Sequence, residues 1–395
     1  MSDAEDKLLS GESWHEFCDR LKGVGDLILG DEFPQARRER TEGFRYLPRL
    51  LSYALQMELE CSAPAFPQLC LYEEPHNQWG GPNPDNTYLR TAIHPDYAYR
   101  VWGNLTDMRQ IIVSLQEGDM QLHQYGVFSE QGLNDWEVAP NGDFELFVSR
   151  ERPEGAANWM PLHEAARIFQ VRIYLSDWVR DSSPTLHIER IGAEGVVPPP
   201  LEPAALAASL DRTANWVEKS AEYWNHYTAK TCERATPNEV GPARSTPGGA
   251  DNILYGSCFW ELEDDEALVF TCEEPEAEYY NFCIHTLGWL ESGDYANRHV
   301  SLAGHQLHID DDGRIRLALS ARDPGIPNWI DPEGRAPGMF AYRWVWATTS
   351  PEPPGQVVKV DTVRELMPGS HPVIDGPERR RRLSARREQF WNRFL

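Results

Sequence analysis

The sequence predicts a mainly β fold with helical additions, an α+β chain built on antiparallel sandwich or barrel blocks. Short apolar or alternating runs, separated by Gly, Pro, Asn and Asp, fill residues 63–200 and 253–375. Helical periodicity marks residues 1–62 ahead of the first block, and a long helical stretch at 201–235 separates the two blocks. A basic, amphipathic stretch at 376–395 predicts a C-terminal helix.

The N-terminal segment is expected to form two amphipathic helices. In the first, apolar residues recur at helical spacing on Trp14, Phe17, Leu21 and Val24. The second is expected over about 41–60, where one face carries Phe44, Leu47, Leu51 and Leu55.

The first β block contains five candidate strands: 99–104, 110–116, 144–149, 168–175 and 185–191. The connecting helix follows, and its buried face is expected to carry Leu206, Leu210, Val217, Ala221 and Trp224. Residues 235–252 are rich in proline and glycine, so we expect a loop there.

The second β block has candidate strands at 267–272, 279–286, 306–309, 314–319 and 340–346. Asp312-Gly313 lies between two of them and predicts a β-hairpin. One side of the C-terminal helix carries Leu383, Phe390, Trp391 and Phe394. We expect this helix to dock on its own acidic chain by that apolar face, and a homo-oligomer contact is the alternative.

The formal charge is strongly negative, because 37 Lys and Arg residues stand against 62 Asp and Glu residues, a net −25. Phosphate backbones and anionic membrane surfaces would be repelled, so we expect neither as a partner. The first residues lack a secretion-signal pattern, and no apolar stretch reaches the roughly 18 residues of a membrane span. Seven cysteines without a CxxC pair predict reduced thiols in a cytoplasmic protein.

Several common catalytic motifs are absent from the sequence, namely GxSxG, GxxxxGK(S/T), GxGxxG and HExxH. Their absence excludes the commonest hydrolase, NTPase, dinucleotide and zinc-protease assignments, and no cofactor is predicted. No metal site is predicted either. His305 and His308 would face opposite sides of an expected strand, and Asp310-Asp311-Asp312 falls at the hairpin turn, where a solvated turn is expected.

A loop rich in Gly, Pro and amides at 80–90 is the first candidate binding segment. Asn83, Asp85 and Arg90 could bind a hydroxyl or a carboxylate of a small-molecule substrate. The alternative, which residue chemistry favours, is that Asn83 and Asp85 cap turns while Arg90 forms an internal ion pair.

The second candidate is a catalytic group. The predicted hairpin brings its two flanking segments side by side, so His299, Asp323 and Asp331 could share one cleft. His299 would be the general base, and Asp323 or Asp331 would orient it or act as the acid.

The same cleft would carry cations and an aromatic wall. Arg298 and Arg322 would bind an anionic group or a developing oxyanion, and Trp329 would form the apolar wall. A structural ion pair between Arg322 and Asp331 is an equally weighted alternative.

Three of these runs resemble a known family. Asn-Pro-Asp-Asn-Thr-Tyr at 83–88, the stretch 297–306, and Arg-Asp-Pro-Gly-Ile-Pro-Asn-Trp-Ile-Asp at 322–331 are similar to the bacterial "domain of unknown function twelve-fourteen" family. The resemblance covers roughly residues 65 to 375 and implies a mostly antiparallel, jelly-roll-like fold with helical additions. It implies little about the reaction. Relatives tend to continue with Thr-Ala-Gly-His where this chain has Pro332-Glu333-Gly334-Arg335, so Arg335 could replace a functional histidine only as a cation.

Two hypotheses about function remain open. The first is a cofactor-independent enzyme, a hydrolase, lyase or isomerase, that applies acid–base chemistry to a small or lipid-like organic molecule. Its substrate could be anionic, because Arg298, Arg322 and Arg335 gather near the predicted cleft. The alternative is a non-catalytic β-sandwich module that binds a carbohydrate or a hydrophobic ligand through tryptophans such as Trp344 and Trp346.

Overall fold

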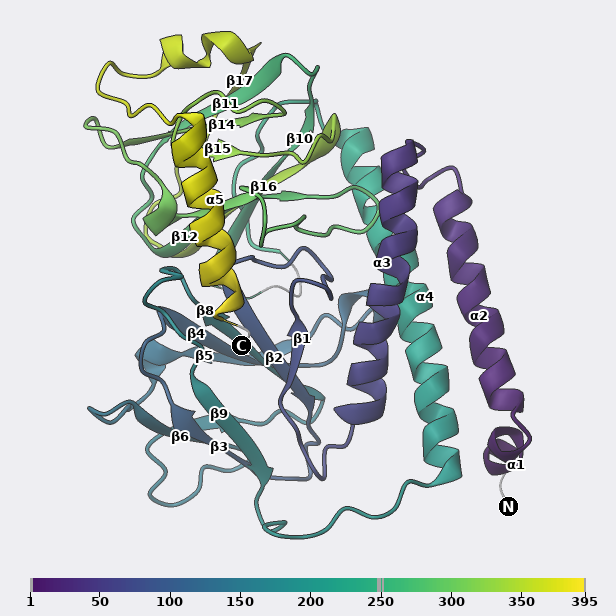
Figure 1. Ribbon diagram of the computed structural model, residues 1–395. Helices are drawn as coiled ribbons and strands as arrows, with labels where there is room; N and C mark the ends of the chain where they lie inside the picture. The colour runs from purple at the N-terminus through teal and green to yellow at the C-terminus, as the bar shows by residue number, and fades with distance from the viewer. Residues whose placement is uncertain (1–2, 247–249, 251, 394–395) are drawn as a thin grey trace. The chain divides into compact units, whose positions relative to one another are not determined.

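The computed structural model describes residues 3–246, 250 and 252–393 (Figure 1). Residues 247–249 and 251 of the expected loop, and Phe394 of the expected C-terminal helix face, lie outside the described residues. The chain divides into two compact units. Unit 1 comprises Met1–Trp79, Asn86–Leu175 and Ser182–His226, and unit 2 comprises Gly80–Asp85, Ser176–Asp181 and Tyr227–Leu395.

The helices of unit 1 are α1 (Asp3–Leu9), α2 (Glu12–Leu29), α3 (Arg37–Leu55), the π-helical turn η1 (Gln56–Glu60), and α4 (Pro203–Arg234), which continues into unit 2. Phe17 of α2 and Leu210 of α4 form a buried cluster that Leu51 and Leu55 of α3 join. The apolar stripes read from the sequence therefore meet one another in part, whereas Trp14 and Phe44 of those stripes are 55% and 45% exposed.

Two sheets complete unit 1. The first runs in the order β1 (Cys70–Glu73), β2 (Asn86–Ala92), β8 (Ile168–Tyr174), β4 (Gln110–Gln116) and β5 (Val127–Gly132). The second runs β7 (Trp159–Pro161), β6 (Asp143–Ser149), β3 (Tyr99–Asn104) and β9 (Thr185–Arg190). Short 3-10 turns occur at η2 (Met120–Leu122) and η3 (Leu133–Asp135). Val101 and Leu146 of one sheet share a buried cluster with Val113 and Val171 of the other, so the sheets pack as a sandwich.

Unit 2 has the same two-sheet plan. One sheet runs β10 (Ile253–Glu261), β16 (Pro337–Ala347), β12 (Ala277–His285) and β13 (Ser301–Ala303). The other runs β15 (Trp329–Ile330), β14 (Arg314–Ser320), β11 (Glu266–Glu273) and β17 (Gly355–Lys359). The remaining elements are the 3-10 turns η4 (Gly304–Gln306) and η5 (Val360–Leu366) and the helix α5 (Gly376–Trp391).

The core of unit 2 is aromatic and tightly packed. Phe270 of β11 stacks on Phe340 of β16, with ring centroids 4.2 Å apart, which joins the two sheets. Gly338 leaves room for the buried indole of Trp260, because a Cβ there would lie 2.2 Å from the Cζ2 atom of that ring. Glycine is therefore a packing requirement at position 338.

The prediction of an α+β chain rich in antiparallel sheet is confirmed, since among the described strand pairs only β6–β7 and β14–β15 are parallel. The expected strand at 306–309 is wrong, because η4 ends at Gln306 and only Ile309 bridges to Ile315. Among the described residues, no helix combines the length and the apolar composition needed to cross a bilayer.

The expectation that all cysteines are reduced is also wrong, because Cys61 and Cys70 form a disulfide. Strand β2 explains the pairing. The backbone N–H of Ala92 on β2 donates to the Cys61 carbonyl. Arg90, two residues before Ala92 on β2, pairs with Cys70 of β1. The end of η1 and the start of β1 are thereby held next to each other. The other five cysteines are free.

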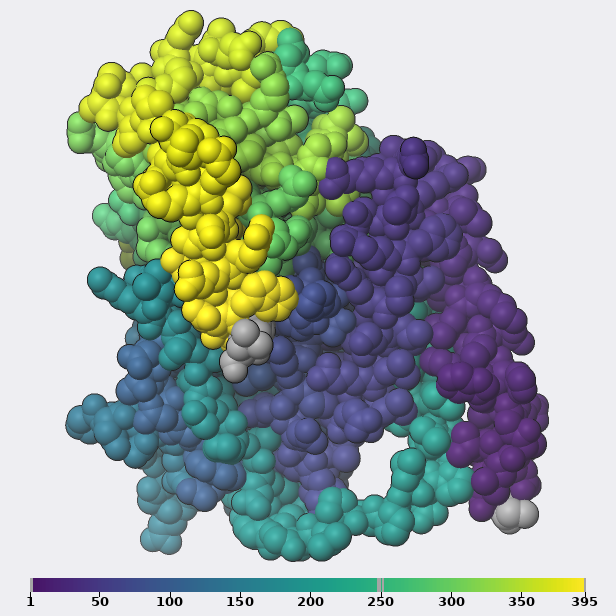
Figure 2. Space-filling model, in the orientation of Figure 1, coloured from purple at the N-terminus to yellow at the C-terminus, as the bar shows by residue number. Residues whose placement is uncertain are grey.

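Helix α5 lies along unit 2 and is seen in yellow in Figure 2. Its expected apolar face docks in part, since Phe390 lies in the core of unit 2 and Trp391 packs against that core, but arginines share the face. Phe390 is fully buried, but Arg379 and Arg386 are buried with it, at 5% and 4% exposure. The guanidinium of Arg386 donates to the Tyr295 carbonyl and to the hydroxyl of Ser301. The arginines therefore bind the body of unit 2 as donors to fixed oxygens.

Candidate functional site

His299, the expected general base, precedes β13 and is only 6% exposed. Neither of its ring nitrogens has a hydrogen-bond partner among the described residues, and its ring centroid lies 6.5 Å from that of Trp329. Burial first, and then the cations Arg386, Arg379 and Arg382, lower the pKa of His299 to about 2. The side chain is therefore a neutral imidazole that no described carboxylate orients.

The two expected catalytic carboxylates are held by arginines. Arg298 donates to Oδ2 of Asp331 at 2.8 Å, and the backbone N–H of Glu333 donates to its Oδ1 at 2.7 Å. Asp323 accepts two hydrogen bonds from Arg379, at 2.8 and 3.0 Å. Each carboxylate is thus a partner of a cation and not of His299, and the predicted His–Asp pair is not formed.

Arg322 and Trp329, the other members of the predicted cleft, also contact other partners. Arg322 donates to Asp361 at 3.3 Å. The alternative ion pair between Arg322 and Asp331 is therefore not formed. Trp329 is 8% exposed and donates its indole N–H to the Ser320 carbonyl at 2.9 Å. Its ring is part of the core of unit 2, where a ligand would have no free face to contact.

Asn83 and Asp85 are buried in a polar network of unit 2. Tyr279 donates its hydroxyl to Oδ2 of Asp85 at 2.5 Å, and the indole N–H of Trp178 donates to Oδ1 at 2.7 Å. Asn281 donates to Asn83 at 2.8 Å. These bonds fix the segment 80–85 onto β12, and they occupy the atoms that were expected to bind substrate.

Arg90 belongs to unit 1, where it forms the internal ion pair that residue chemistry favoured. Its two terminal nitrogens donate to both oxygens of Asp119, at 3.1 and 3.3 Å, and one of them also donates to the Tyr53 hydroxyl. Trp216 donates a further hydrogen bond to Asp119 at 2.8 Å. Although burial opposes it, Asp119 keeps the pKa of Arg90 above its ordinary value.

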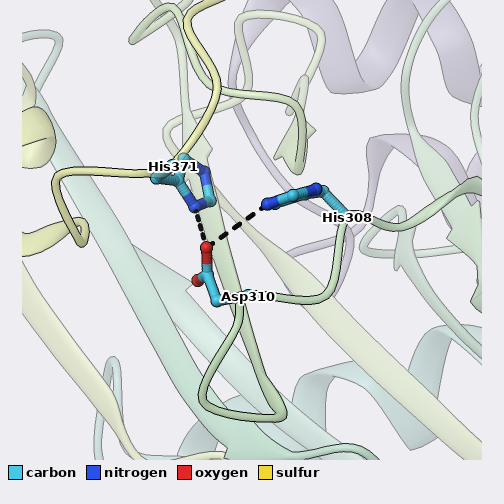
Figure 3. A group of neighbouring side chains, drawn as sticks. All are labelled: His308, Asp310 and His371. Atoms are coloured by element: carbon cyan, nitrogen blue, oxygen red, sulfur yellow. Dashed lines mark hydrogen bonds and ion pairs between the residues drawn. The ribbon is translucent and has the colours of Figure 1, made fainter.

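A histidine–carboxylate cluster that the sequence did not predict lies in unit 2 (Figure 3). Nδ1 of His371 lies 2.7 Å from Oδ1 of Asp310, and Nε2 of His308 lies 3.4 Å from the same oxygen. Asp310 and His371 have side-chain exposures of 1% and 0%, whereas that of His308 is 34%. Arg316 donates to the other oxygen of Asp310 at 2.7 Å.

The electrostatics of this cluster follow from its burial. Burial opposes ionisation of Asp310, but the hydrogen bonds from Arg316 and His371 outweigh it and lower the pKa of that carboxyl group. Burial also lowers the pKa of His371, although Asp310 works in the opposite direction.

No local signal in the sequence could have found this cluster. His308 and Asp310 stand two apart just before β14, but His371 lies 61 residues beyond Asp310, between η5 and α5. The expectation of no metal site treated His305 with His308 and the run 310–312 separately, and the strand expected at 306–309 is absent.

Unit 1 carries two surface hollows that share the side chains of Trp102 and His187. The first, of about 510 Å³, lies along β9 and is lined by Phe66, Leu69, Leu186, Ile188 and Arg190 among others. The second, of about 610 Å³, is lined by Arg100, Asn104, Asp143, Glu145 and Thr185 among others. The rings of Trp102 and His187 stack with centroids 5.3 Å apart.

In the first hollow, the guanidinium of Arg190 is held over the ring of Tyr97 at 4.7 Å and over that of Phe66 at 6.0 Å. Its Nε atom is buried, and it has no hydrogen-bond partner within the described part of the chain. The stacking fixes a cation whose donor is not used by the protein.

One comparison with a solved structure agrees with this fold. A crystal structure of an uncharacterised protein from Burkholderia cenocepacia shares 31% sequence identity and superposes with a TM-score of 0.84, covering 90% of this chain and 99% of that chain. The VPA0106 protein from Vibrio parahaemolyticus, at 13% identity and a TM-score of 0.46, covers 85% of this chain and 100% of that chain.

No family model matches the sequence, and no curated protein matches it. The similarity to the Burkholderia cenocepacia protein extends over nearly the whole of both chains. The chain therefore belongs to the same family as that protein.

Proposed function

We propose that the protein binds a small organic molecule with an apolar body and one anionic group in the hollow along β9. The observation that carries the proposal is the guanidinium of Arg190, which is stacked on the ring of Tyr97 and lines this hollow. The volume of about 510 Å³ falls within the range of small-molecule sites, roughly 300–1,000 Å³.

The hollow lies at the free edge of strand β9. Strand β9 is the last strand of its sheet, so its outer edge has no further strand beside it. Residues 65–69 and 193–196 form the opposite wall. Apolar side chains continue outward from this wall, since Ile191, Val196 and Val197 are 42%, 51% and 84% exposed. Such a patch next to a hollow is typical of a binding surface.

The chemistry of the lining sets the orientation of the ligand. A carboxylate or sulfate would accept hydrogen bonds from Arg190, and an apolar body would contact Phe66 and Ile188. Glu189 is also in the lining, so a second anionic group on the ligand would be repelled. This arrangement favours an amphipathic monoanion over a neutral carbohydrate.

Titration calorimetry with decanoate, and with 1-decanol as the neutral probe, tests the proposal. We expect Arg190→Met to weaken decanoate binding by at least about tenfold while leaving 1-decanol unchanged, because a charge-assisted hydrogen bond contributes about 1.5–3 kcal/mol. Arg100→Met is the matched control, since Arg100 pairs with Glu145 on the exposed face of β3. Equal affinity of the wild type for both probes, or an unaffected Arg190 variant, would refute the proposal.

Acid–base catalysis by His299, Asp323 and Asp331, of the hydrolase or lyase kind, stays a prediction from the sequence. The contacts of these side chains speak against acid–base catalysis, because both carboxylates are paired with arginines and His299 is buried. A cytoplasmic location and a homo-oligomer through α5 also stay predictions. Mass in solution before and after deletion of α5 would test the latter.

A further inference from the structure

We propose that His308, Asp310 and His371 form a binding site for a divalent first-row transition-metal ion, for which Zn²⁺ is the representative probe. The site lies in unit 2, so the proposal is independent of ligand binding at β9. It rests on the separations of the donor atoms, on the residues that hold the ligands in place, and on the exposure of His308.

The separations of the donor atoms suit one ion. Ligand atoms at roughly 2.0–2.1 Å from a tetrahedral Zn²⁺ lie roughly 3.3 Å from one another. Here Oδ1 of Asp310 lies 3.4 Å from Nε2 of His308 and 2.7 Å from Nδ1 of His371, and one ligand atom from each of the three residues lies within 4.8 Å of the others. Each imidazole ring presents one nitrogen to the same oxygen of Asp310 (Figure 3).

His371 contributes Nδ1, the nitrogen that faces Asp310, and its side chain has no exposed surface. The ion would take the place of the proton that Nδ1 and Oδ1 of Asp310 share, because metal ligands must be deprotonated.

The surrounding residues hold the ligands in place. Arg316 donates to Oδ2 of Asp310 and leaves Oδ1 facing the two histidines. The side-chain amide of Asn328, which is fully buried, accepts from the backbone N–H of His308 and donates to its carbonyl, each at 2.8 Å. Such outer contacts orient ligands before the ion arrives.

The donor set and the exposure of the site define the class of ion. Two imidazoles with one carboxylate suit Zn²⁺, Fe²⁺ and Co²⁺, whereas Ca²⁺ and Mg²⁺ prefer oxygen ligands alone. The exposed third of the His308 side chain gives the site a route to solvent and room for a water on the ion. Sites with three protein ligands and one open position are typical of metal centres that activate water.

The experiment uses the full chain, freed of metal by EDTA and then of EDTA by dialysis. We expect calorimetry to show one Zn²⁺ bound per chain. We expect His308→Gln to weaken binding by at least about tenfold, because one of three ligands is lost. His305→Gln is the matched control, since His305 is exposed, lies three residues earlier and stands outside the cluster, and this variant should bind as the wild type does.

Co²⁺ provides a readout that does not depend on a variant folding. Bound at this site in the wild type, Co²⁺ should give the intense visible absorption of four- or five-coordinate ions in place of the weak spectrum of the hydrated ion. Absence of uptake by the wild type, a hydrated-type spectrum, or equal Zn²⁺ affinity in a folded His308→Gln variant would each overturn the proposal. The cluster would then be a hydrogen-bonded tie between β14 and the segment before α5.

Discussion

Asp85 offers the sharpest test of whether the buried polar network of unit 2 is structural. In Asp85→Asn the side chain keeps its shape, but one oxygen becomes an NH₂ group, which cannot accept from Tyr279 or from Trp178. Because Asp85 has no exposed surface, water cannot replace the lost acceptor. We therefore expect a loss of stability and no direct effect on ligand binding in unit 1.

The size of the loss follows from the contacts. A hydrogen bond to a charged acceptor contributes about 1.5–3 kcal/mol, and the substitution removes one and weakens the other. Burial lowers the pKa of Arg386 to about 10 and that of Arg393 as well, and Asp85 opposes both shifts, so the variant also removes a counter-charge from two buried cations. Relief of the desolvation of the carboxylate works in the opposite direction. The net expectation is a loss of about 2–4 kcal/mol in the free energy of unfolding.

Urea unfolding followed by circular dichroism measures this loss, and hydrogen exchange of peptides from β12 assigns it to unit 2. Asp361→Asn is the matched control, because the Asp361 side chain is 81% exposed and only its surface ion pair with Arg322 is lost. That control should change the free energy of unfolding by less than about 0.5 kcal/mol. An Asp85→Asn variant as stable as the control would show that the network does not depend on the carboxylate.

Two further substitutions test burial and packing. The unfolded state protonates His299 near its ordinary pKa of 6.5, whereas the folded state resists protonation down to about pH 2, so stability falls as the pH drops below 6.5. Through this residue alone the wild type should lose about 2 kcal/mol of unfolding free energy between pH 6.5 and 4.5, and His299→Leu should lose correspondingly less. An equal fall of the urea midpoint between these two pH values in both proteins would contradict the assignment. Gly338→Ala should lower the free energy of unfolding by about 2 kcal/mol or more, because its Cβ meets Trp260. Gly23→Ala on α2, where a Cβ meets nothing within 4 Å, should raise the free energy of unfolding by about 0.5–1 kcal/mol. The reverse order of urea midpoints would be inconsistent with the packing.

The sequence was informative where structure follows from local periodicity. The helix α4 and its buried positions Leu210, Val217 and Trp224 could be read from spacing alone, and so could strands such as β4 and β14. The α+β class follows from these elements. The expected strand at 306–309 is wrong, because the side chain of Asn328, 20 residues further along the chain, forms the hydrogen bonds with the backbone of His308 that a neighbouring strand would form.

The candidate site could not be predicted in the same way, because its contacts join residues that are distant in the sequence. Asp323 and Asp331 were recognised as carboxylates near one hairpin, but their partners are decided by Arg379 on α5 and by Arg298. The pairing of His371 with Asp310 likewise depends on where the chain returns after η5. Residue chemistry indicated which groups carry charge, and only the tertiary structure shows which of them are already neutralised.

The arginines of the C-terminal segment also bear on how the protein is made. Arg379, Arg386 and Arg393 are spaced seven residues apart, and each donates to a backbone carbonyl of an earlier loop, at Ile326, Tyr295 and Pro84. These donors are synthesised after the loops that they bind. Unit 2 therefore completes these buried hydrogen bonds only once this segment has left the ribosome, and a chain truncated before the segment exposes its unpaired carbonyls to the cell's proteases.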